Sequence, residues 1–170
     1  MRKKAYLCSR DLARWPTPEE LESYFVGPPE HRWDFEDGND SVLLTGEGAD
    51  GTEHLGNSYD RVDIMLKMWG DPDLGVLLVW TKWGGGHRQA YTSKGDLTRL
   101  HEYMLTLHDD PLPIGLFVSF EQAWRAVKEF LETDGALPRS IAWIAGQDLP
   151  PDTFPNQYEF RLRQEGRATS

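Results

Sequence analysis

The stretch Gly75-Val-Leu-Leu-Val-Trp-Thr-Lys-Trp83 decides the fold, because it is rich in β-branched and aromatic residues and its first half is apolar on both faces. This pattern is typical of a central strand of a sheet. Before it, apolar residues alternate with polar ones over residues 62–68, and Asp71-Pro72-Asp73 predicts a turn. After it, Gly84-Gly85-Gly86 turns the chain into a returning strand over residues 87–93. Three adjacent strands with short connections predict an antiparallel meander.

A short N-terminal helix is predicted to begin at Thr17, which can cap it, with a proline next and Glu20 completing a capping box. Gly27-Pro28-Pro29 stops this helix. Further short strands are expected over residues 3–9 and around residues 42–44.

The clearest element is an amphipathic helix from about Ser119 to Thr133, where Ser119 and Gln122 form a second capping box. Its buried face is predicted to hold Ala123, Trp124, Val127, Phe130 and Leu131. Gly135 is placed to end the helix in a left-handed conformation, and residues 140–144 are expected to form a final strand beside it. Residues 96–108 fit either a helix or a strand.

The predicted fold class is α+β: an antiparallel meander sheet packed against a C-terminal amphipathic helix, with a short N-terminal helix. The length of 170 residues predicts one domain, over residues 1–150, followed by a tail over residues 151–170 that is open to partial disorder. No long apolar run predicts a membrane span, and no apolar stretch near the N-terminus predicts a signal peptide. Because Cys8 is the only cysteine, we expect a reducing, cytoplasmic compartment.

Acidic residues outnumber basic ones by 28 to 18, which gives a formal net charge of -10 and argues against direct binding of nucleic acid. Ten acidic residues and two basic ones lie between Glu30 and Asp63, so most of this charge falls in a fifth of the chain. The stretch is either a solvated surface that maintains solubility or a docking face for a basic protein. Asp34-Phe-Glu-Asp-Gly-Asn-Asp40 also suggests calcium binding, but it lacks the closing glutamate of an EF-hand loop.

Motifs for catalysis or cofactor binding are not found in the sequence. The five histidines lie far apart in the sequence. A helix could align one pair, His101 and His108, as metal ligands. The preferred interpretation is that both are exposed residues beside a loop. Gly84-Gly85-Gly86 leads into a strand and lacks the ending of a phosphate-binding loop. We therefore predict no catalytic residue, no cofactor and no metal.

Tryptophan is frequent, with 7 in the chain. Trp124 and Trp143 are explained by core packing. Trp80 and Trp83 lie three residues apart on one strand and must point to opposite faces, so that one of them is less buried. Two interpretations are open. With Trp69 across the turn, the less buried tryptophan forms an exposed aromatic patch suited to a protein interface, or a core covers both faces of the sheet.

The C-terminal half resembles the immunity protein 1 family of bacterial polymorphic-toxin systems. The resemblance covers about residues 60–145, and the segments that carry it are Tyr91–Asp96, Val118–Ala123, Ala126–Thr133, Gly135, Leu137-Pro138 and Trp143. Asp134 stands before Gly135 as an extra residue relative to the family pattern. The family favours a strand rather than a helix near Leu100 to Leu107.

The resemblance implies a cytoplasmic antitoxin, without catalytic residues, that binds and blocks a cognate toxin, commonly a nuclease or a nucleic-acid deaminase. Such toxins need a basic substrate groove, which an acidic partner can occupy. We hypothesise that this groove meets acidic residues flanked by apolar anchors: Trp33, Glu36, Asp37, Asp40, Glu47, Asp50, Glu53 and Trp83. The expected partner is therefore a basic protein, with no membrane, and the chain is expected to be a monomer or a weak homodimer.

Two other classes of function stay open. A small ligand-binding or scaffold domain would show a pocket in place of the exposed acidic face. An unrecognised hydrolase would require the region of His101 and His108 to bind a metal ion, which a thermal shift with zinc or manganese tests.

Overall fold

The computed structural model describes residues 1–7, 10–27, 33 and 41–169. Its main sheet has seven strands in the order β2-β1-β3-β4-β5-β6-β9, and every pair of neighbours is antiparallel. The strands are β1 (Arg2–Leu7), β2 (Arg10–Leu12), β3 (Ser41–Ala49), β4 (Val62–Asp71), β5 (Gly75–Gly84), β6 (His87–Ser93) and β9 (Trp143–Ala145). The predicted meander is thus confirmed as β4-β5-β6, with β5 in its centre.

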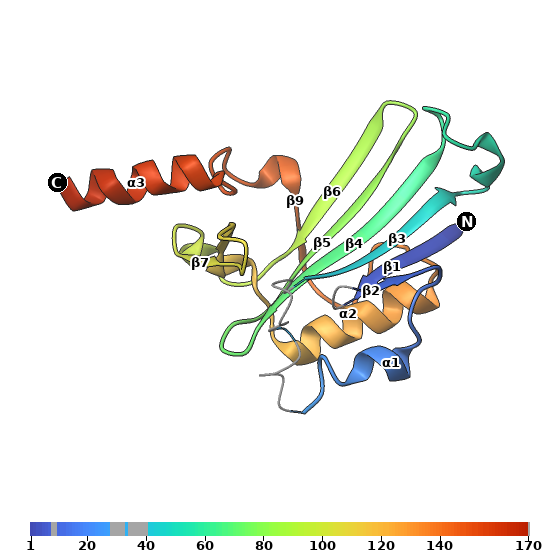
Figure 1. The fold of residues 1–170 in the computed structure, drawn as a ribbon, viewed down its shortest axis with the longest axis horizontal. Coiled ribbons are helices and arrows are strands. Elements are labelled where there is room, and N and C mark those ends of the chain that lie inside the picture. Colours follow the sequence, from blue (N-terminus) through green and yellow to red (C-terminus); the bar gives the residue numbers. More distant parts are fainter. Residues whose placement is uncertain (8–9, 28–32, 34–40, 170) are drawn as a thin grey trace.

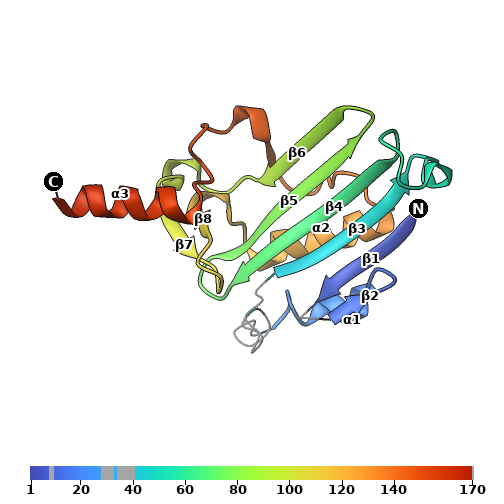
Figure 2. The ribbon, with the colours of Figure 1, turned by 45° about the horizontal axis from the view of Figure 1, so that its top comes forward.

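Helices α1 (Pro18–Glu22) and α2 (Phe120–Glu132) cover one face of this sheet, as Figures 1 and 2 show. Both predicted capping boxes are present, with Thr17 and Glu20 at the start of α1 and Ser119 and Gln122 at the start of α2. The α+β class with its two helices is therefore confirmed.

The core between α2 and the sheet is rich in tryptophan. Trp15 packs on Phe130 of α2 with ring centroids 4.9 Å apart, and Trp124 stacks on Phe25 at 5.2 Å. The indole N–H of Trp15 donates to the Thr45 carbonyl at 2.7 Å, and that of Trp80 donates to the Gly135 carbonyl at 2.9 Å. Trp15 and Trp80 therefore keep their polar groups satisfied while filling the core.

The second face of the sheet is covered only in part. A lobe built from β7 (Tyr103–Leu105) and β8 (Pro111–Pro113) lies over one end of it. Leu77 of β5 is fully buried here, in a cluster with Leu100, Leu112, Leu116 and Phe117. The lobe settles the open choice at residues 96–108: the strand that the family favours is confirmed over Tyr103–Leu105, and a 3-10 helix precedes it at Leu97–Arg99.

Two C-terminal elements differ from the expectations. The final strand begins at Trp143 rather than near residue 140, and it pairs with β6 instead of lying against α2. Residues 157–169 form helix α3 (Gln157–Thr169), which extends from the body of the molecule in Figure 1 and which the sequence pattern did not predict.

Helix α2 ends through two consecutive residues with positive φ. Asp134, the extra residue in the family comparison, has φ 57°, and Gly135 has φ 96°. The Gly135 N–H donates to the Phe130 carbonyl at 2.9 Å, which closes the helix end as a Schellman motif. Gly135 therefore takes the predicted left-handed conformation. Asp134 precedes it as the first left-handed residue, because a short polar side chain tolerates a positive φ.

Trp33, a predicted anchor, lies in the core with 2% of its surface exposed, and its indole N–H donates to the Tyr24 carbonyl at 2.8 Å. Its ring lies directly over Gly70 of β4, where an added Cβ would stand 2.1 Å from the indole. Gly70 is therefore the residue that makes room for Trp33 in the core.

We expect Gly70→Ala to lower the free energy of unfolding by about 1–3 kcal/mol, because the methyl group must displace the packed indole. Gly166→Ala in α3 is the matched control, because an added Cβ there has no atom within 4 Å. Denaturant unfolding measures both variants. Equal stability of Gly70→Ala and the wild type would contradict this placement of Trp33.

Candidate protein-binding site

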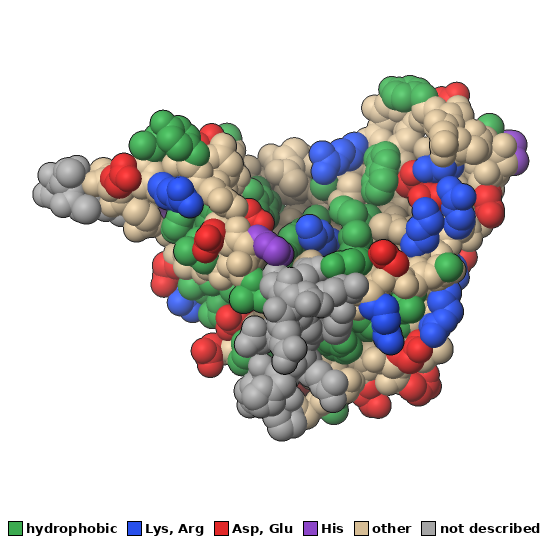
Figure 3. Space-filling view, in the orientation of Figure 1, with side chains coloured by type: hydrophobic (Ala, Val, Ile, Leu, Met, Phe, Trp, Pro, Cys, Tyr) green, Lys and Arg blue, Asp and Glu red, His purple; other side chains and the backbone are tan. Residues whose placement is uncertain are grey.

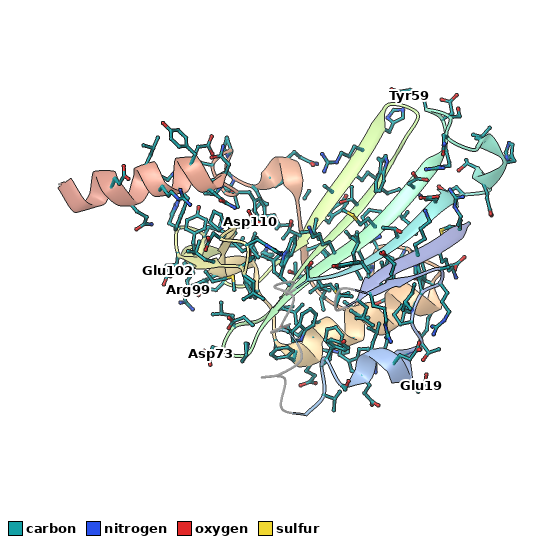
Figure 4. All side chains as sticks on the ribbon, viewed as in Figure 1. Glu19, Tyr59, Asp73, Arg99, Glu102 and Asp110 are labelled. Atoms are coloured by element: carbon teal, nitrogen blue, oxygen red, sulfur yellow. The ribbon has the colours of Figure 1, made fainter. Side chains whose placement is uncertain are left out.

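The uncovered part of the sheet ends in two connections that lie together. We call this region the hairpin end: the β3–β4 connection, residues 50–61, and the β5–β6 turn, Gly85-Gly86. The Gly85 N–H donates to the Tyr59 carbonyl at 2.9 Å, which ties the two connections to each other. Tyr59 marks this end in Figure 4, whereas Asp73 and Glu19 lie at the opposite side of the molecule.

The structure brings part of the predicted site together at the hairpin end. Asp50 and Glu53 lie in the β3–β4 connection, and Trp83 lies next to the β5–β6 turn, with 37% of its surface exposed. Trp33 lies in the core instead, so Trp83 is the exposed one of the two predicted anchors. The remaining acidic predictions, Glu36, Asp37 and Asp40, lie outside the described residues.

The aromatic patch suggested for Trp69 and Trp83 does not form, although both side chains are on the second face. Trp69 pairs with Leu77 in the register of β4 and β5, whereas Trp83 pairs with Asp63, so the two rings lie at opposite ends of these strands. The lobe half-buries Trp69, and the Lys67 ammonium lies 4.6 Å from its ring centre. The prediction placed them together because it counted sequence distance across the turn and not the register.

Glu47 belongs to a network of ion pairs inside the chain. It accepts hydrogen bonds from Arg2 and from Lys4, the latter at 2.9 Å. Arg61 lies 3.9 Å from Glu47 and donates two hydrogen bonds to the buried Asp63, at 2.8 and 2.7 Å. This network joins β1, β3 and β4, so the charge of Glu47 is balanced within the molecule.

The cations around Glu47 change its pKa. The hydrogen bond from the Lys4 ammonium is the largest cause. Desolvation opposes it, but with the hydrogen bond from Arg2 and the charges of both cations the net effect lowers the pKa of Glu47. The Glu53 carboxylate meets the amino group of Met1, which lowers the pKa of Glu53 in the same way. Both groups are therefore charged at neutral pH.

Asp50 and Glu53 differ from Glu47 in exposure. Their side chains are 59% and 61% exposed, against 22% for Glu47. Asp50 pairs with Lys82 at 2.7 Å. Both acids line a pocket of about 600 Å³ between the β3–β4 connection and the C-terminal end of α2. Because exposed ion pairs contribute little energy, a partner's cations can replace the internal ones at little cost.

Tyr59 and Asp60 are candidate site residues that the sequence analysis did not include. Tyr59 is 77% exposed, the most exposed large hydrophobic side chain of the described residues. The Asp60 side chain is exposed and has no hydrogen bond or ion pair within the described residues. A tyrosine followed by an aspartate between polar turn residues is the available signal, but the sequence analysis assigned no role to this pair.

Figure 3 shows acidic and basic side chains interspersed at this end of the molecule rather than a continuous acidic face. Within the described residues, no group of three or more His, Cys, Asp or Glu side chains could hold a metal ion, and this part includes His101 and His108. No helix among the same residues is long and apolar enough to cross a membrane.

We expect Glu47→Gln to destabilise the protein at pH 7 by up to about 1 kcal/mol, because it removes the negative charge that holds β1 to β3. The folded pKa of Glu47 lies below its unfolded value, so the stabilisation is complete above the ordinary pKa of about 4.3 and is lost as the pH falls through the folded value. Thermal unfolding between pH 7 and pH 3 measures this.

Glu19→Gln is the control, since Glu19 is exposed and forms no hydrogen bond or ion pair within the described part of the chain. The gap between the wild type and Glu47→Gln narrows in acid, while the Glu19→Gln variant follows the wild type throughout. A gap that stays constant down to pH 3 would contradict the role of the Glu47 charge.

Comparison with known proteins shows the family to which the chain belongs. The model of the immunity protein Imm1 family matches residues 36–145. The match begins 24 residues earlier than expected, and so includes β3 and the β3–β4 connection as well as strands β4 to β9 and α2, but not β1 and β2. Searches of curated proteins and of solved structures gave no match. The matched span is well over half of the chain, and the protein therefore belongs to the Imm1 immunity protein family.

Proposed function

We propose that this protein binds and neutralises a cognate toxin domain, and that the hairpin end is its docking surface. The Imm1 family makes it an immunity protein. The finer proposal is that the toxin is a nuclease or a nucleic-acid deaminase whose basic substrate groove receives acidic side chains of this surface. Blocking a groove needs no chemistry from the inhibitor.

One observation carries this proposal: the described part of the acidic stretch places Asp50, Glu53 and Asp60 on one exposed connection. Asp60 is unpaired within the described residues. Asp50 and Glu53 are themselves exposed, and a toxin's lysines or arginines can replace their present partners, Lys82 and the amino group of Met1. Such carboxylates attract a basic groove and raise the rate of association. Glu47 supports them by holding β1 and β4 to β3 behind the surface.

Two aromatic side chains supply apolar contact beside these carboxylates. Tyr59 lies on the β3–β4 connection and Trp83 lies next to the β5–β6 turn, and the Gly85 N–H joins these two connections. Tryptophan and tyrosine are common among the residues that contribute most to binding, because large rings bury much area at little entropic cost. We therefore assign the anchoring role to Trp83 and Tyr59, and a structural role to Trp33.

Reversing three charges of the hairpin end tests the proposal. We expect Asp50→Lys/Glu53→Lys/Asp60→Lys to slow association with the toxin domain encoded beside this chain by about tenfold or more at low salt, and to weaken rescue of cells that express the toxin. Stopped-flow association and co-expression measure the two effects.

The matched control reverses three exposed acids elsewhere, with Glu19→Lys/Asp73→Lys/Glu121→Lys, so that both variants change the net charge equally. This control is expected to lose much less of the association rate than the hairpin-end variant. If both variants bind the toxin as the wild type does at low salt, the interface lies elsewhere.

A further inference from the structure

The second face of the main sheet carries a groove beside the β7–β8 lobe. Its floor consists of side chains from β4, β5 and β6, namely Trp69, Val79 and Thr92. Across from this floor lies the segment that follows β9, of which Leu149 and Phe154 line the groove. Its volume of about 440 Å³ is within the range of ligand pockets. Figure 2 turns this face toward the viewer, with α2 behind the sheet.

The lining of the groove is mostly apolar, and the side chains of the described residues leave it open. Val79 and Leu149 pack from this lining onto the buried cluster around Leu77, so the groove rests on a fixed core. Phe154 instead keeps 45% of its surface exposed. Apolar surface that gathers around an open groove is typical of a site that binds a partner.

Arg88 is the charged residue among those that line the groove in the described part of the chain. Its side chain is exposed and has no hydrogen bond or ion pair with any described residue. Arg88 also lines a pocket of about 410 Å³ together with Trp83, so it lies between the groove and the hairpin end. An exposed guanidinium that no described carboxylate neutralises is available to an anion of a partner.

A second cation adds to the positive charge of this face. Lys67 of β4 pairs with Val79 in the register of β4 and β5, so the two side chains lie on the same face. The Lys67 ammonium lies 4.6 Å from the centre of the Trp69 ring, and it forms no ion pair with an acidic residue that the structure describes. The groove and its surroundings therefore have the opposite charge to the acidic β3–β4 connection.

We propose that a segment of the toxin with a large apolar side chain next to a carboxylate docks in this groove. The apolar side chain enters between Val79 and Phe154, and the carboxylate accepts hydrogen bonds from the Arg88 guanidinium. This inference rests on the proposed function and deepens it, because contacts of opposite charge at the hairpin end and at the groove fix the orientation of the toxin. A second copy of the chain suits the groove less well, since both copies carry a net charge of -10.

Reversing the charge of Arg88 tests the contact with the carboxylate. We expect Arg88→Glu to weaken binding of the toxin domain encoded beside this chain by about tenfold or more, and Arg88→Lys, which keeps the charge, to weaken it less. Arg125→Glu is the matched control, because Arg125 is exposed on α2, behind the other face of the sheet, and the net charge changes equally. Equal losses of affinity in Arg88→Glu and Arg125→Glu would reduce the effect to net charge and overturn the contact.

Truncating Phe154 tests the apolar contact. We expect Phe154→Ala to weaken toxin binding by about tenfold. Its melting temperature is expected to change little, because the ring is half exposed in the free protein. Tyr158→Ala is the control, since Tyr158 is an exposed ring on α3 that does not line the groove. Titration calorimetry measures the affinity of all these variants.

The dye 8-anilinonaphthalene-1-sulfonate probes the groove in the absence of the toxin, because it joins aromatic rings to an anionic group. We expect the wild-type protein to bind the dye with a rise in fluorescence, and Arg88→Glu to bind it about tenfold more weakly. Saturation with the toxin domain is expected to release the dye. Equal affinity of the wild type and Arg88→Glu for the dye would contradict the role of the guanidinium.

The outcomes distinguish this inference from the function on which it rests. A stable complex that leaves the dye in place, or that Arg88→Glu and Phe154→Ala do not weaken, would overturn docking in the groove and leave the immunity function intact. Release of the dye as the protein's own concentration rises would assign the groove to a second copy and overturn the proposal. Failure of the protein and the toxin to form any complex would overturn both.

Discussion

The structure depends on one constraint: β5 is apolar on both faces, and each face needs a cover. Helix α2 covers the first face, and the indole N–H of Trp80 in β5 donates a hydrogen bond to the carbonyl of Gly135 beyond the helix end. The β7–β8 lobe covers the second face, but only over the half of β5 that contains Leu77. The other half, toward Trp83, therefore keeps an exposed apolar surface beside the hairpin end.

Charge determines what that open half can bind. The cations of β1 balance Glu47, and Arg61 satisfies the buried Asp63, so these two carboxylates are neutralised within the molecule. The exposed carboxylates of Asp50, Glu53 and Asp60 lie outside this network and are available to a basic partner at little cost. An acidic connection and two exposed aromatic side chains, Tyr59 and Trp83, thus lie at one end of the sheet.

Local signals predicted the fold well, because they depend on neighbouring residues. The capping boxes at Thr17 and Ser119 begin both helices where expected, and the alternation from Val62 identified β4. Long-range contacts were not predictable. Trp33 is buried because Gly70, far away in the sequence, leaves room for its ring, and Glu47 is neutralised by residues of β1 more than forty positions earlier. The site prediction therefore grouped Asp50 and Glu53, which share one connection, but it took the buried Trp33 for an exposed anchor.

Hydroxyl-radical footprinting of the protein alone and with its toxin tests the central claim most directly, because exposed aromatic rings report on both ends of the molecule. Tyr59 and Trp83 lie at the hairpin end, whereas Tyr158, 70% exposed on α3, serves as a reference. The account predicts that oxidation of Tyr59 and Trp83 falls in the complex and that of Tyr158 does not. Protection of Tyr158 with Tyr59 and Trp83 unchanged would contradict it.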